Sequence, residues 1–281
     1  MSELVDKSLL VAKKGVKIHS LAVVDSRAEI EEGVVVGPGA VIGPDVKIGS
    51  QTWIGPNVIL DGRLRIGSEN KIFPGACLGL EPQDLKYQGA STEVVIGDRN
   101  TIREYVTINR ATKEGEQTKI GNDNLLMAYC HLGHNCLLGD GIVMSNGIQV
   151  AGHVVIEDRA VIGGCLGIHQ FVHIGGLAMV GGMTRVDRDV PPYSLVEGHP
   201  GRLRGLNRVG LKRNGIDHKK KDELKNLQEI WSMLFRSNYV LAESLILAQQ
   251  QTLFPASEHL CNFMEASIGQ GRRGPMPFGL G

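Results

Sequence analysis

Aliphatic residues recur along this chain at every sixth position, with small and polar residues between them. The repeat runs from Ile18 to Leu78, resumes at Ile96, and continues from Ile120 to Val186. An α-helix repeats about every 3.6 residues and an amphipathic strand every second residue, so neither explains this period. A chain that turns a corner after each hexad does explain it. Each hexad therefore predicts one short strand, and three hexads predict one triangular coil of a parallel β-helix.

The coils of such a prism stack through parallel hydrogen bonds about 4.8 Å apart. The aliphatic residue of each hexad is predicted to point inward, and the glycine that often follows it is expected to tolerate positive φ at the corner. The fifth place of the hexad is often small or branched and is also expected to face inward; examples are Ala22, Ala28, Val34, Ala40 and Val46. The sequence thus predicts a mainly β fold, with the parallel β-helix over residues 1–200.

Two segments break the repeat and are predicted to loop out of the prism, residues 79–95 and residues 113–119. Long excursions from a regular scaffold are often functional. The adjacent prolines Pro191 and Pro192 are expected to end the run of strands, because proline donates no hydrogen bond to a ladder.

Residues 201–281 are predicted to form a basic linker followed by a small C-terminal α-helical domain. Beyond Gly215 the apolar residues take helical spacing. This spacing predicts three helices, near residues 224–235, 239–253 and 257–268. The tail from Gly269 onward is expected to be disordered.

Composition narrows the class of protein. The formal net charge is zero, so no overall field favours nucleic acid or an anionic membrane. Five cysteines without secretory context indicate reduced thiols and a cytoplasmic protein, and no signal peptide is recognised. Residues 160–184 are apolar and long enough to span a bilayer, but their seven glycines, two histidines and fit to the repeat predict strands instead.

The segment 130–136, CHLGHNC, carries the first candidate chemistry. Hexads that begin at Leu132, Val150 and Ile168 are eighteen residues apart, so they fall on the same face of consecutive coils. Their polar side chains are predicted to form a column along one edge: His134, His153, His169 and Gln170. His131 and His173 are instead expected near corners. An exposed histidine suits general base catalysis, since its ordinary pKa lies near neutral pH.

A metal site within one chain is not expected. Cys130 and Cys136 take equivalent inward places on different faces, so they cannot share an ion and are predicted to behave as small hydrophobic residues. Two alternatives remain open at this point. One is a zinc site between subunits, as in the hexad-repeat γ-class carbonic anhydrases, and the other is a non-enzymatic β-helical scaffold with surface histidines.

A set of motifs resembles a known family. It comprises EPQDLKYQG from position 81, IGDRNTIREYVTINRAT from 96, IGNDNLLMAYCHLGHNCLLGD from 120, QVAGHVV from 149, DVPPY from 189 and GLKRNG from 210. These are similar to the UDP-N-acetylglucosamine acyltransferases over nearly the whole chain. The resemblance implies a left-handed parallel β-helix, active as a cytoplasmic homotrimer with sites between adjacent subunits.

The resemblance also implies a reaction and its residues. Members move a 3-hydroxyacyl group from acyl carrier protein to the 3-hydroxyl of UDP-N-acetylglucosamine, the first step of lipid A synthesis, without a cofactor beyond the thioester donor. His134 resembles the general base, and Gly152 the backbone donor to the oxyanion. The resemblance implies substrate-binding roles for Gln83, Asp84, Lys86, His131, His153, Gln170, Asn207 and Arg213. Residues 201–221 hold eight Lys or Arg against one Asp, which favours an acidic partner.

Some positions depart from the family pattern. Asn135 stands where many members carry Asp directly after the base, so it can accept a hydrogen bond from the imidazole but supplies no charge. Asn109 and Asn214 replace a histidine and an arginine. Gly182 matches a position that closes the acyl groove when bulky, which predicts acceptance of chains longer than ten carbons, although Met183 beside it could shorten the groove.

Overall fold

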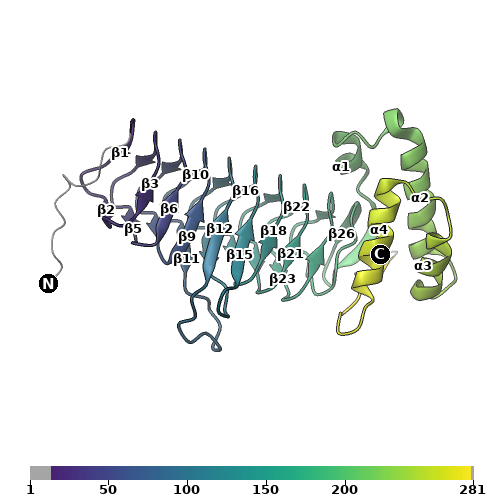
Figure 1. Ribbon diagram of the computed structural model, residues 1–281. Coiled ribbons are helices and arrows are strands. Elements are labelled where there is room, and N and C mark those ends of the chain that lie inside the picture. Colours follow the sequence, from purple (N-terminus) through teal and green to yellow (C-terminus); the bar gives the residue numbers. More distant parts are fainter. Residues whose placement is uncertain (1–13, 280–281) are drawn as a thin grey trace.

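A computed structural model describes residues 14–279 as a triangular prism of three parallel sheets (Figure 1). We name them sheets A, B and C, and the chain visits them in that order in each coil. Sheet A contains β1 (Lys17–Ile18), β4 (Val35–Val36), β7 (Trp53–Ile54), β10 (Lys71–Ile72), β13 (Thr101–Ile102), β16 (Leu125–Leu126), β19 (Val143–Met144), β22 (Val161–Ile162), β25 (Met179–Val180), β26 (Ser194–Glu197) and β27 (Arg202–Leu206).

The other two sheets have eight strands each. Sheet B contains β2 (Val23–Val24), β5 (Val41–Ile42), β8 (Ile59–Leu60), β11 (Cys77–Leu80), β14 (Thr107–Asn109), β17 (His131–Leu132), β20 (Gln149–Val150) and β23 (Gly167–Ile168). Sheet C contains β3 (Glu29–Ile30), β6 (Val46–Ile48), β9 (Arg63–Ile66), β12 (Glu93–Ile96), β15 (Gln117–Ile120), β18 (Leu137–Leu138), β21 (Val155–Ile156) and β24 (His173–Ile174). The parallel β-helix predicted from the hexads is confirmed.

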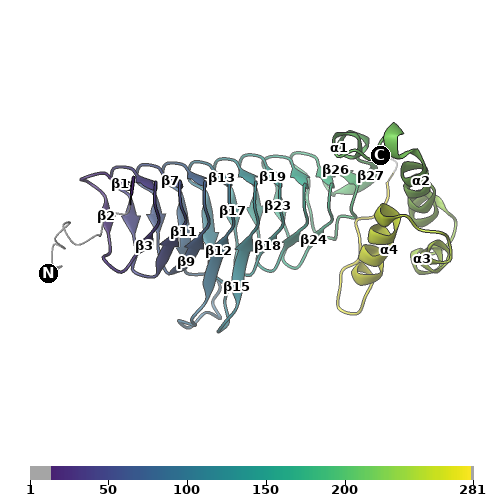
Figure 2. The same ribbon diagram turned by 45° about the horizontal axis from the view of Figure 1, so that its top comes forward.

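Both predicted excursions leave the prism at the corner where sheet B turns into sheet C, which we call the B/C corner. One joins β11 to β12 and spans residues 81–92, and the other joins β14 to β15 and spans residues 110–116. Figures 1 and 2 show the two loops projecting from the same edge of the prism. They are tied together, because Ser91 N–H donates to Glu114 Oε2 at 2.7 Å and Gly115 N–H donates to the Ser91 carbonyl at 3.1 Å.

The C-terminal part begins with strands rather than with a linker. β26 pairs in parallel with β25 and antiparallel with β27, so the expectation that Pro191 and Pro192 end the strands is wrong. These prolines lie in the turn before β26, outside the ladder. The boundary at residue 200 stays a prediction, and the β26–β27 hairpin crosses it.

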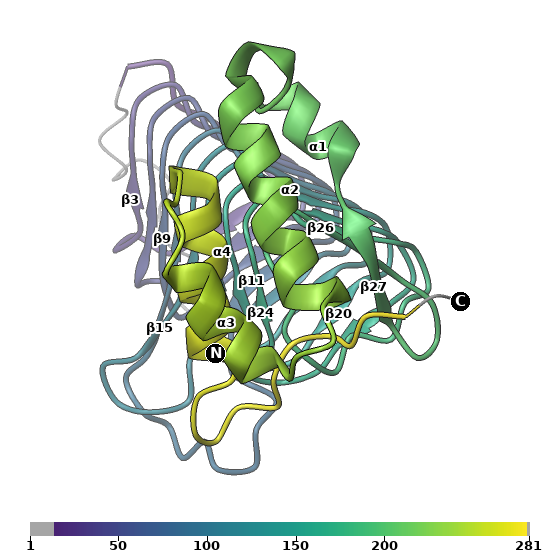
Figure 3. The ribbon, with the colours of Figure 1, turned by 90° about the vertical axis from the view of Figure 1, so that its right-hand side faces the viewer.

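The helices follow this hairpin. They are α1 (Arg208–Arg213), the short 3₁₀ helix η2 (His218–Lys220), α2 (Lys221–Arg236), α3 (Leu241–Gln249) and α4 (Pro255–Ser267). Figure 3 shows α2, α3 and α4 lying across the C-terminal end of the prism. The three predicted helices are confirmed: α2 is longer than predicted, α3 is shorter, and α4 begins and ends slightly earlier. The helix α1 was not predicted. The spacing of α2 predicted its inward face, where Leu227, Ile230, Trp231 and Leu234 are buried.

The tail packs against the last coils, so the expectation of disorder is wrong for residues 269–279. Asp189 is buried, and its carboxylate accepts hydrogen bonds from Ser267 Oγ and Arg272 Nη2, both at 2.7 Å. Asp189 N–H also donates to the Gly274 carbonyl, and Met276 is buried beside this segment. A buried carboxylate requires such partners, which explains why the glycine-rich tail is held in place.

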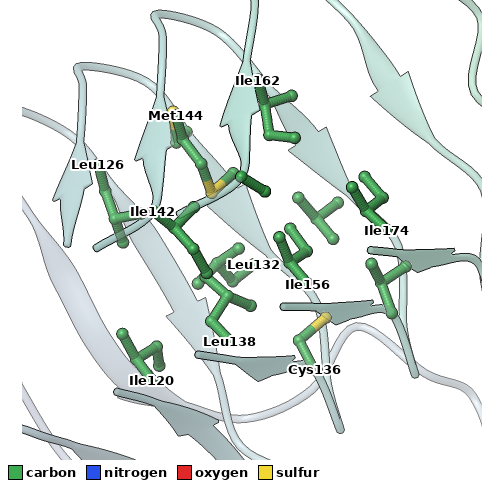
Figure 4. Close-up of a cluster of buried hydrophobic side chains, with 14 of the residues drawn as sticks. Ile120, Leu126, Leu132, Cys136, Leu138, Ile142, Met144, Ile156, Ile162 and Ile174 are labelled. Carbon is green, nitrogen blue, oxygen red and sulfur yellow. The ribbon is translucent and has the colours of Figure 1, made fainter. Parts of the chain in front are cut away.

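The interior of the prism is filled by the aliphatic residue of each hexad. Figure 4 shows these side chains pointing toward one another, among them Ile120, Leu126, Leu132 and Ile156. From Ile30 onward the repeat positions are buried, in agreement with the predicted register. Cys130 and Cys136 also face this interior, as predicted.

Glycine has a different role at the corners from the one expected. Gly133, which follows its aliphatic residue, has no positive φ. A Cβ there would lie 3.0 Å from backbone atoms of the next coil, including Ala151 C and Gly152 N. Positive φ falls instead on the fourth residue of the hexad, where Asn57 has a φ of 56° and Asn135 one of 62°. Glycine after the aliphatic residue is therefore needed for close packing between coils.

A ladder of buried asparagines runs along the corner between sheets C and A. Asn70 Oδ1 accepts from Asn100 N–H at 2.8 Å, Asn100 Oδ1 from Asn124 N–H at 2.9 Å, and Asn124 Oδ1 from Ile142 N–H at 2.7 Å. Each Nδ2 donates to a glycine carbonyl of the following coil. The amides satisfy backbone groups that the corner would otherwise leave buried and unpaired.

We expect Asn100→Ala to lower the free energy of unfolding by about 2–3 kcal/mol, because the Asn124 N–H and the Gly121 carbonyl each lose a partner. Urea unfolding followed by circular dichroism at fixed protein concentration measures this change. Asn262→Ala, on the exposed face of α4, is the matched control and should shift stability by no more than about 0.5 kcal/mol. Equal effects of the two substitutions would contradict the ladder.

Candidate active site

The B/C corner brings together the two loops and the polar residues that follow β17 and β20. His134 lies two residues after the last residue of β17, and Gly152 lies two residues after the last residue of β20. These strands are neighbours in sheet B, so the two residues occupy equivalent places on consecutive coils. Asp84 comes from the loop at 81–92 and Glu116 from the loop at 110–116.

The His134 ring has a different partner at each nitrogen. Nδ1 lies 2.9 Å from Asn135 Oδ1, and Nε2 lies 3.7 Å from Asp84 Oδ2. The His153 ring stands edge-on to the His134 ring, with centroids 5.1 Å apart. The loop at 81–92 therefore brings a carboxylate to the same side of the imidazole from which a substrate hydroxyl could approach.

Hydrogen bonds hold the Asp84 carboxylate in this place. Lys86 N–H donates to Oδ1 at 3.0 Å, and Thr112 Oγ1 donates to Oδ2 at 3.3 Å. The Lys86 N–H bond, followed by the nearby His134, keeps the pKa of Asp84 below its usual value. Thr112 belongs to the second loop, so the position of Asp84 depends on both excursions.

Because Gly152 has no side chain, it leaves room for the His134 imidazole. A Cβ on this residue would lie 2.4 Å from His134 Nε2. Gly152 is buried, and within residues 14–279 its N–H donates to no protein acceptor. The same place of the hexad is proline at Pro38, Pro56 and Pro74, as expected for a position whose N–H is outside the ladder. A buried unpaired N–H beside a basic nitrogen can bind an oxyanion.

His153 and Phe171 continue this corner. His153 N–H donates to the His134 carbonyl at 2.9 Å, and the His153 ring stacks on Phe171 with centroids 4.9 Å apart. Burial and then the neighbouring His134 lower the pKa of His153, which favours a neutral ring at neutral pH. His169 makes contacts of its own at this corner: its Nδ1 lies 3.0 Å from the Gln170 carbonyl oxygen, and its Nε2 lies 3.3 Å from Arg273 Nη2.

His131 and His173 lie in strands β17 and β24, so the expectation of corners is wrong. The residue before the inward aliphatic residue is still in the strand, and its side chain faces outward by the two-residue alternation. His131 Nδ1 lies 2.7 Å from Thr107 Oγ1 on the adjacent strand, and burial lowers the pKa of His131. Gln170 is exposed at the B/C corner, and Gln83 and Lys86 are exposed in the loop at 81–92.

The remaining candidates lie at other corners of the prism. Gly182 and Met183 follow β25 at the corner between sheets A and B, and both are exposed. Asn207 caps α1 beside the corner between sheets C and A: its Oδ1 accepts from Gly210 N–H at 2.9 Å, and its Nδ2 donates to the Leu177 carbonyl at 2.8 Å. Arg213 is exposed at the end of α1. One chain alone does not bring these residues to His134.

The cysteines of the CHLGHNC segment have no nucleophilic character. Burial raises the pKa of Cys130 and raises that of Cys136 to about 12, so little thiolate forms at neutral pH. Across residues 14–279, no three His, Cys, Asp or Glu side chains are grouped to hold a metal ion. Among the helices of the same range, none has the length and apolar character needed to cross a membrane.

Four residues of the site were not identified from the sequence: Thr107, Thr112, Glu116 and Phe171. Glu116 falls within the second predicted break, residues 113–119, which marked the segment but not the side chain, and Thr112 lies just before that break. Together, the coil of hexads, a corner histidine whose Nε2 lies 3.7 Å from Asp84 Oδ2, and a glycine N–H without a protein acceptor in residues 14–279 fit an acyltransferase of the hexapeptide-repeat class.

Comparison with known proteins identifies the family. A family model described as UDP N-acetylglucosamine O-acyltransferase, domain 2, matches residues 189–276. The acyl-[acyl-carrier-protein]–UDP-N-acetylglucosamine O-acyltransferase of Gloeothece citriformis is 52% identical over 221 residues, covering 78% of this chain and 79% of that protein. The enzyme of the same description from Synechocystis sp. is 48% identical over 221 residues, with coverage of 78% and 79%.

A solved structure of LpxA from Acinetobacter baumannii matches with a TM-score of 0.86 and 36% identity, covering 92% of this chain and 99% of that one. The chain therefore belongs to the acyl-[acyl-carrier-protein]–UDP-N-acetylglucosamine O-acyltransferase family. It has the left-handed parallel β-helix expected from the resemblance. Family membership favours an O-acyltransferase over the carbonic anhydrase and scaffold alternatives.

We expect Gly152→Ala to reduce acyl transfer by about a hundredfold or more, because the new Cβ meets His134 Nε2 and displaces the imidazole. Initial rates of the purified variant measure the loss of acyl transfer, and its circular dichroism spectrum checks that the variant is folded. Gly205→Ala is the control, since a Cβ there meets nothing within 4 Å. Wild-type activity in Gly152→Ala would exclude this packing.

Proposed function

We propose that the chain transfers a 3-hydroxyacyl group from acyl carrier protein to the 3-hydroxyl of UDP-N-acetylglucosamine, the first step of lipid A synthesis. The observation that carries the proposal is that His134 Nε2 lies close to Gly152 on the next coil, whose N–H donates to no protein acceptor within residues 14–279. Family membership supports the two substrates. The reaction uses no cofactor beyond the thioester of the donor, and the enzyme acts in the cytoplasm.

His134 acts as the general base. Its Nε2 takes the proton of the sugar hydroxyl while the oxygen attacks the thioester carbonyl carbon. The resulting oxyanion is stabilised by the Gly152 N–H. Collapse of this intermediate forms the ester and breaks the C–S bond, and the thiolate of the carrier takes the proton back from the imidazolium. The imidazole is then neutral again, the carrier leaves as a thiol, and His134 can act as the base in another cycle.

The loop at 81–92 binds the sugar end of the acceptor. Asp84 is fixed beside His134 by Lys86 N–H and Thr112, so its carboxylate can accept a hydrogen bond from a sugar hydroxyl near the base. Gln83 and Lys86 are exposed on the same loop and bind the polar parts of the acceptor. His131, His153 and Gln170 bind substrate on the side of the β-helix coils.

The working assembly is a homotrimer whose sites combine corners of neighbouring subunits. Within one chain the candidate residues occupy three different corners, which supports a site completed by a second copy. The outer face of sheet B also exposes Val23, Val41 and Ile59, apolar surface that a neighbouring subunit would cover. In this arrangement Asn207 and Arg213 reach the base of the adjacent subunit.

The donor binds through charge and through an open groove. Six cations near α1 and η2 are exposed and suit an acidic carrier protein: Arg208, Lys212, Arg213, Lys219, Lys220 and Lys221. At Gly182 an added Cβ would come no closer than 3.4 Å to Gly164, and Met183 is 76% exposed. This open corner supports acyl chains longer than ten carbons.

We expect wild-type protein to acylate UDP-N-acetylglucosamine from a 3-hydroxyacyl carrier protein, and His134→Ala to lose about a hundredfold or more of kcat, because no other group takes the hydroxyl proton. A radiolabelled acceptor assay measures the rate. His19→Ala, an exposed histidine at the other end of the prism, is the control. Survival of activity in His134→Ala would refute the base, and absence of transfer by the wild type would refute the reaction.

Mixing of inactive subunits tests the shared site. His134→Ala and Arg213→Ala proteins, each impaired alone, should regain up to about a quarter of wild-type activity when unfolded and refolded together in equal amounts. The gain arises because one mixed interface in four would pair an intact base with an intact arginine. Activity that stays at the average of the two single variants would mean that both residues serve the same subunit's site.

A further inference from the structure

Asn135 connects the base to a carboxylate from the second loop. Asn135 Oδ1 lies 2.9 Å from His134 Nδ1, and Asn135 Nδ2 donates to Glu116 Oε2 at 2.7 Å. Glu116 is part of the segment that interrupts the hexads, so it reaches the site only because the chain leaves the prism between β14 and β15. His134, Asn135 and Glu116 thus form a chain of hydrogen bonds from the imidazole to the negative charge of the Glu116 carboxylate.

This chain of hydrogen bonds determines the orientation of the Asn135 amide. An ionised carboxylate only accepts hydrogen bonds, so the Asn135 group facing Glu116 must be the NH₂. The Thr112 N–H points at the other end of the amide, 3.2 Å from Oδ1, which requires the same orientation. Two independent contacts therefore agree on which end of the amide faces His134.

The amide orientation in turn determines the tautomer of His134. Asn135 Oδ1 can only accept, so Nδ1 must carry the ring proton. Nε2 is then left with its lone pair, on the side of Gly152 and Asp84 where the acceptor hydroxyl is expected. A reversed amide would present a donor to Nδ1 and favour the proton on Nε2, which is the wrong tautomer for a base at that position.

Hydrogen bonds within its loop hold the Glu116 carboxylate beside the Asn135 amide. Its carboxylate accepts from Lys113 N–H at 3.2 Å, and its own N–H donates to the Lys113 carbonyl at 3.0 Å. Burial opposes ionisation, but the hydrogen bonds from Asn135 and Lys113 outweigh it and keep the pKa of Glu116 below its usual value. Asn135 is anchored from the other side, because its N–H donates to Thr118 Oγ1 at 2.9 Å.

We propose that Glu116 is a positioning residue for acyl transfer: through the Asn135 amide it keeps the proton of His134 on Nδ1 and supplies the negative charge that stabilises the imidazolium. The proposal rests on the proposed role of His134 as the base. It explains how the chain works without an acid directly after that histidine, since the charge is present one hydrogen bond farther away.

Other charged groups surround the imidazole and do not replace Glu116. Asp84 faces Nε2 from the loop at 81–92, on the side where substrate must enter, so it cannot act on Nδ1. The remaining titratable groups near His134 belong to β17, the following coil and the two loops, and are His131, His153, Lys86 and Lys113. Within residues 14–279, the hydrogen bonds of the Asn135 amide are to His134, Thr112 and Glu116, and to none of these four groups.

The test replaces the Glu116 carboxylate by an amide, and in a double variant also replaces the Asn135 amide by a carboxylate. We expect Glu116→Gln to lower kcat about tenfold or more with little change in KM, because the charge acts on the proton transfer and not on substrate binding. Without that charge the imidazolium is less stable, so the acidic limb of the kcat/KM profile should move to lower pH. The double variant Glu116→Gln/Asn135→Asp restores one carboxylate and one amide, and should recover kcat and the position of the limb.

Glu114→Gln is the matched control, since Glu114 lies in the same loop and bonds to Ser91 N–H without touching Asn135. An effect of Glu116→Gln no larger than that of Glu114→Gln would overturn the proposal. So would a lower kcat with an unmoved acidic limb and no recovery in the double variant, which would indicate a role in loop folding alone.

The ¹⁵N shifts of the His134 ring separate this proposal from the proposed function, because they report the protonated nitrogen without any turnover. We expect Nδ1–H in the wild type and a mixture of tautomers in Glu116→Gln. The same tautomer in both proteins would overturn the role of Glu116 even if His134→Ala confirms the base. The expected tautomers together with an active His134→Ala protein would instead leave the chain of hydrogen bonds correct and the base wrong.

Discussion

The stacking of backbone hydrogen bonds from coil to coil determines where every side chain of the site lies. His131 N–H donates to the Ile148 carbonyl and Gly133 N–H to the Val150 carbonyl, each at 2.9 Å, so one coil lies directly on the next. Two residues eighteen positions apart then share one place on the prism, as His134 and Gly152 do. The position of His134 beside Gly152 is thus a consequence of the register between coils, and any shift of register would separate the proposed base from the proposed oxyanion donor.

The same stacking limits where new parts can be added. An insertion within a strand would break two ladders, whereas an insertion at a corner leaves the strands before and after it in register. Both loops use the B/C corner, and β12 still pairs with β9 and β15 across them. Because the loops leave consecutive coils, they contact each other, and Thr112 of one can position Asp84 of the other.

These constraints explain which features could be predicted. The period of six identified the sheets, the buried residues and the alignment of His134 with the coil that carries His153, since each follows from regular geometry, whereas Gly152 was indicated only by the family resemblance. It could not identify Thr112 or Glu116, because a loop has no period to place its side chains. It also assigned the wrong role to Gly133, whose neighbours lie in another coil, and it missed the ordered tail, which depends on the buried carboxylate of Asp189 and on residues about eighty positions away.

The structure also gives a reason for asparagine beside His134. Asn135 occupies the fourth place of its hexad with a φ of 62°, a left-handed conformation that asparagine tolerates better than most residues. Its amide has one end that only accepts and one that only donates, so it can receive the imidazole N–H and pass a hydrogen bond on to Glu116. An aspartate there would instead place its charge close to that of Glu116. The chain therefore has a consistent arrangement, in which the corner residue supplies backbone geometry and orientation while the loop supplies the charge.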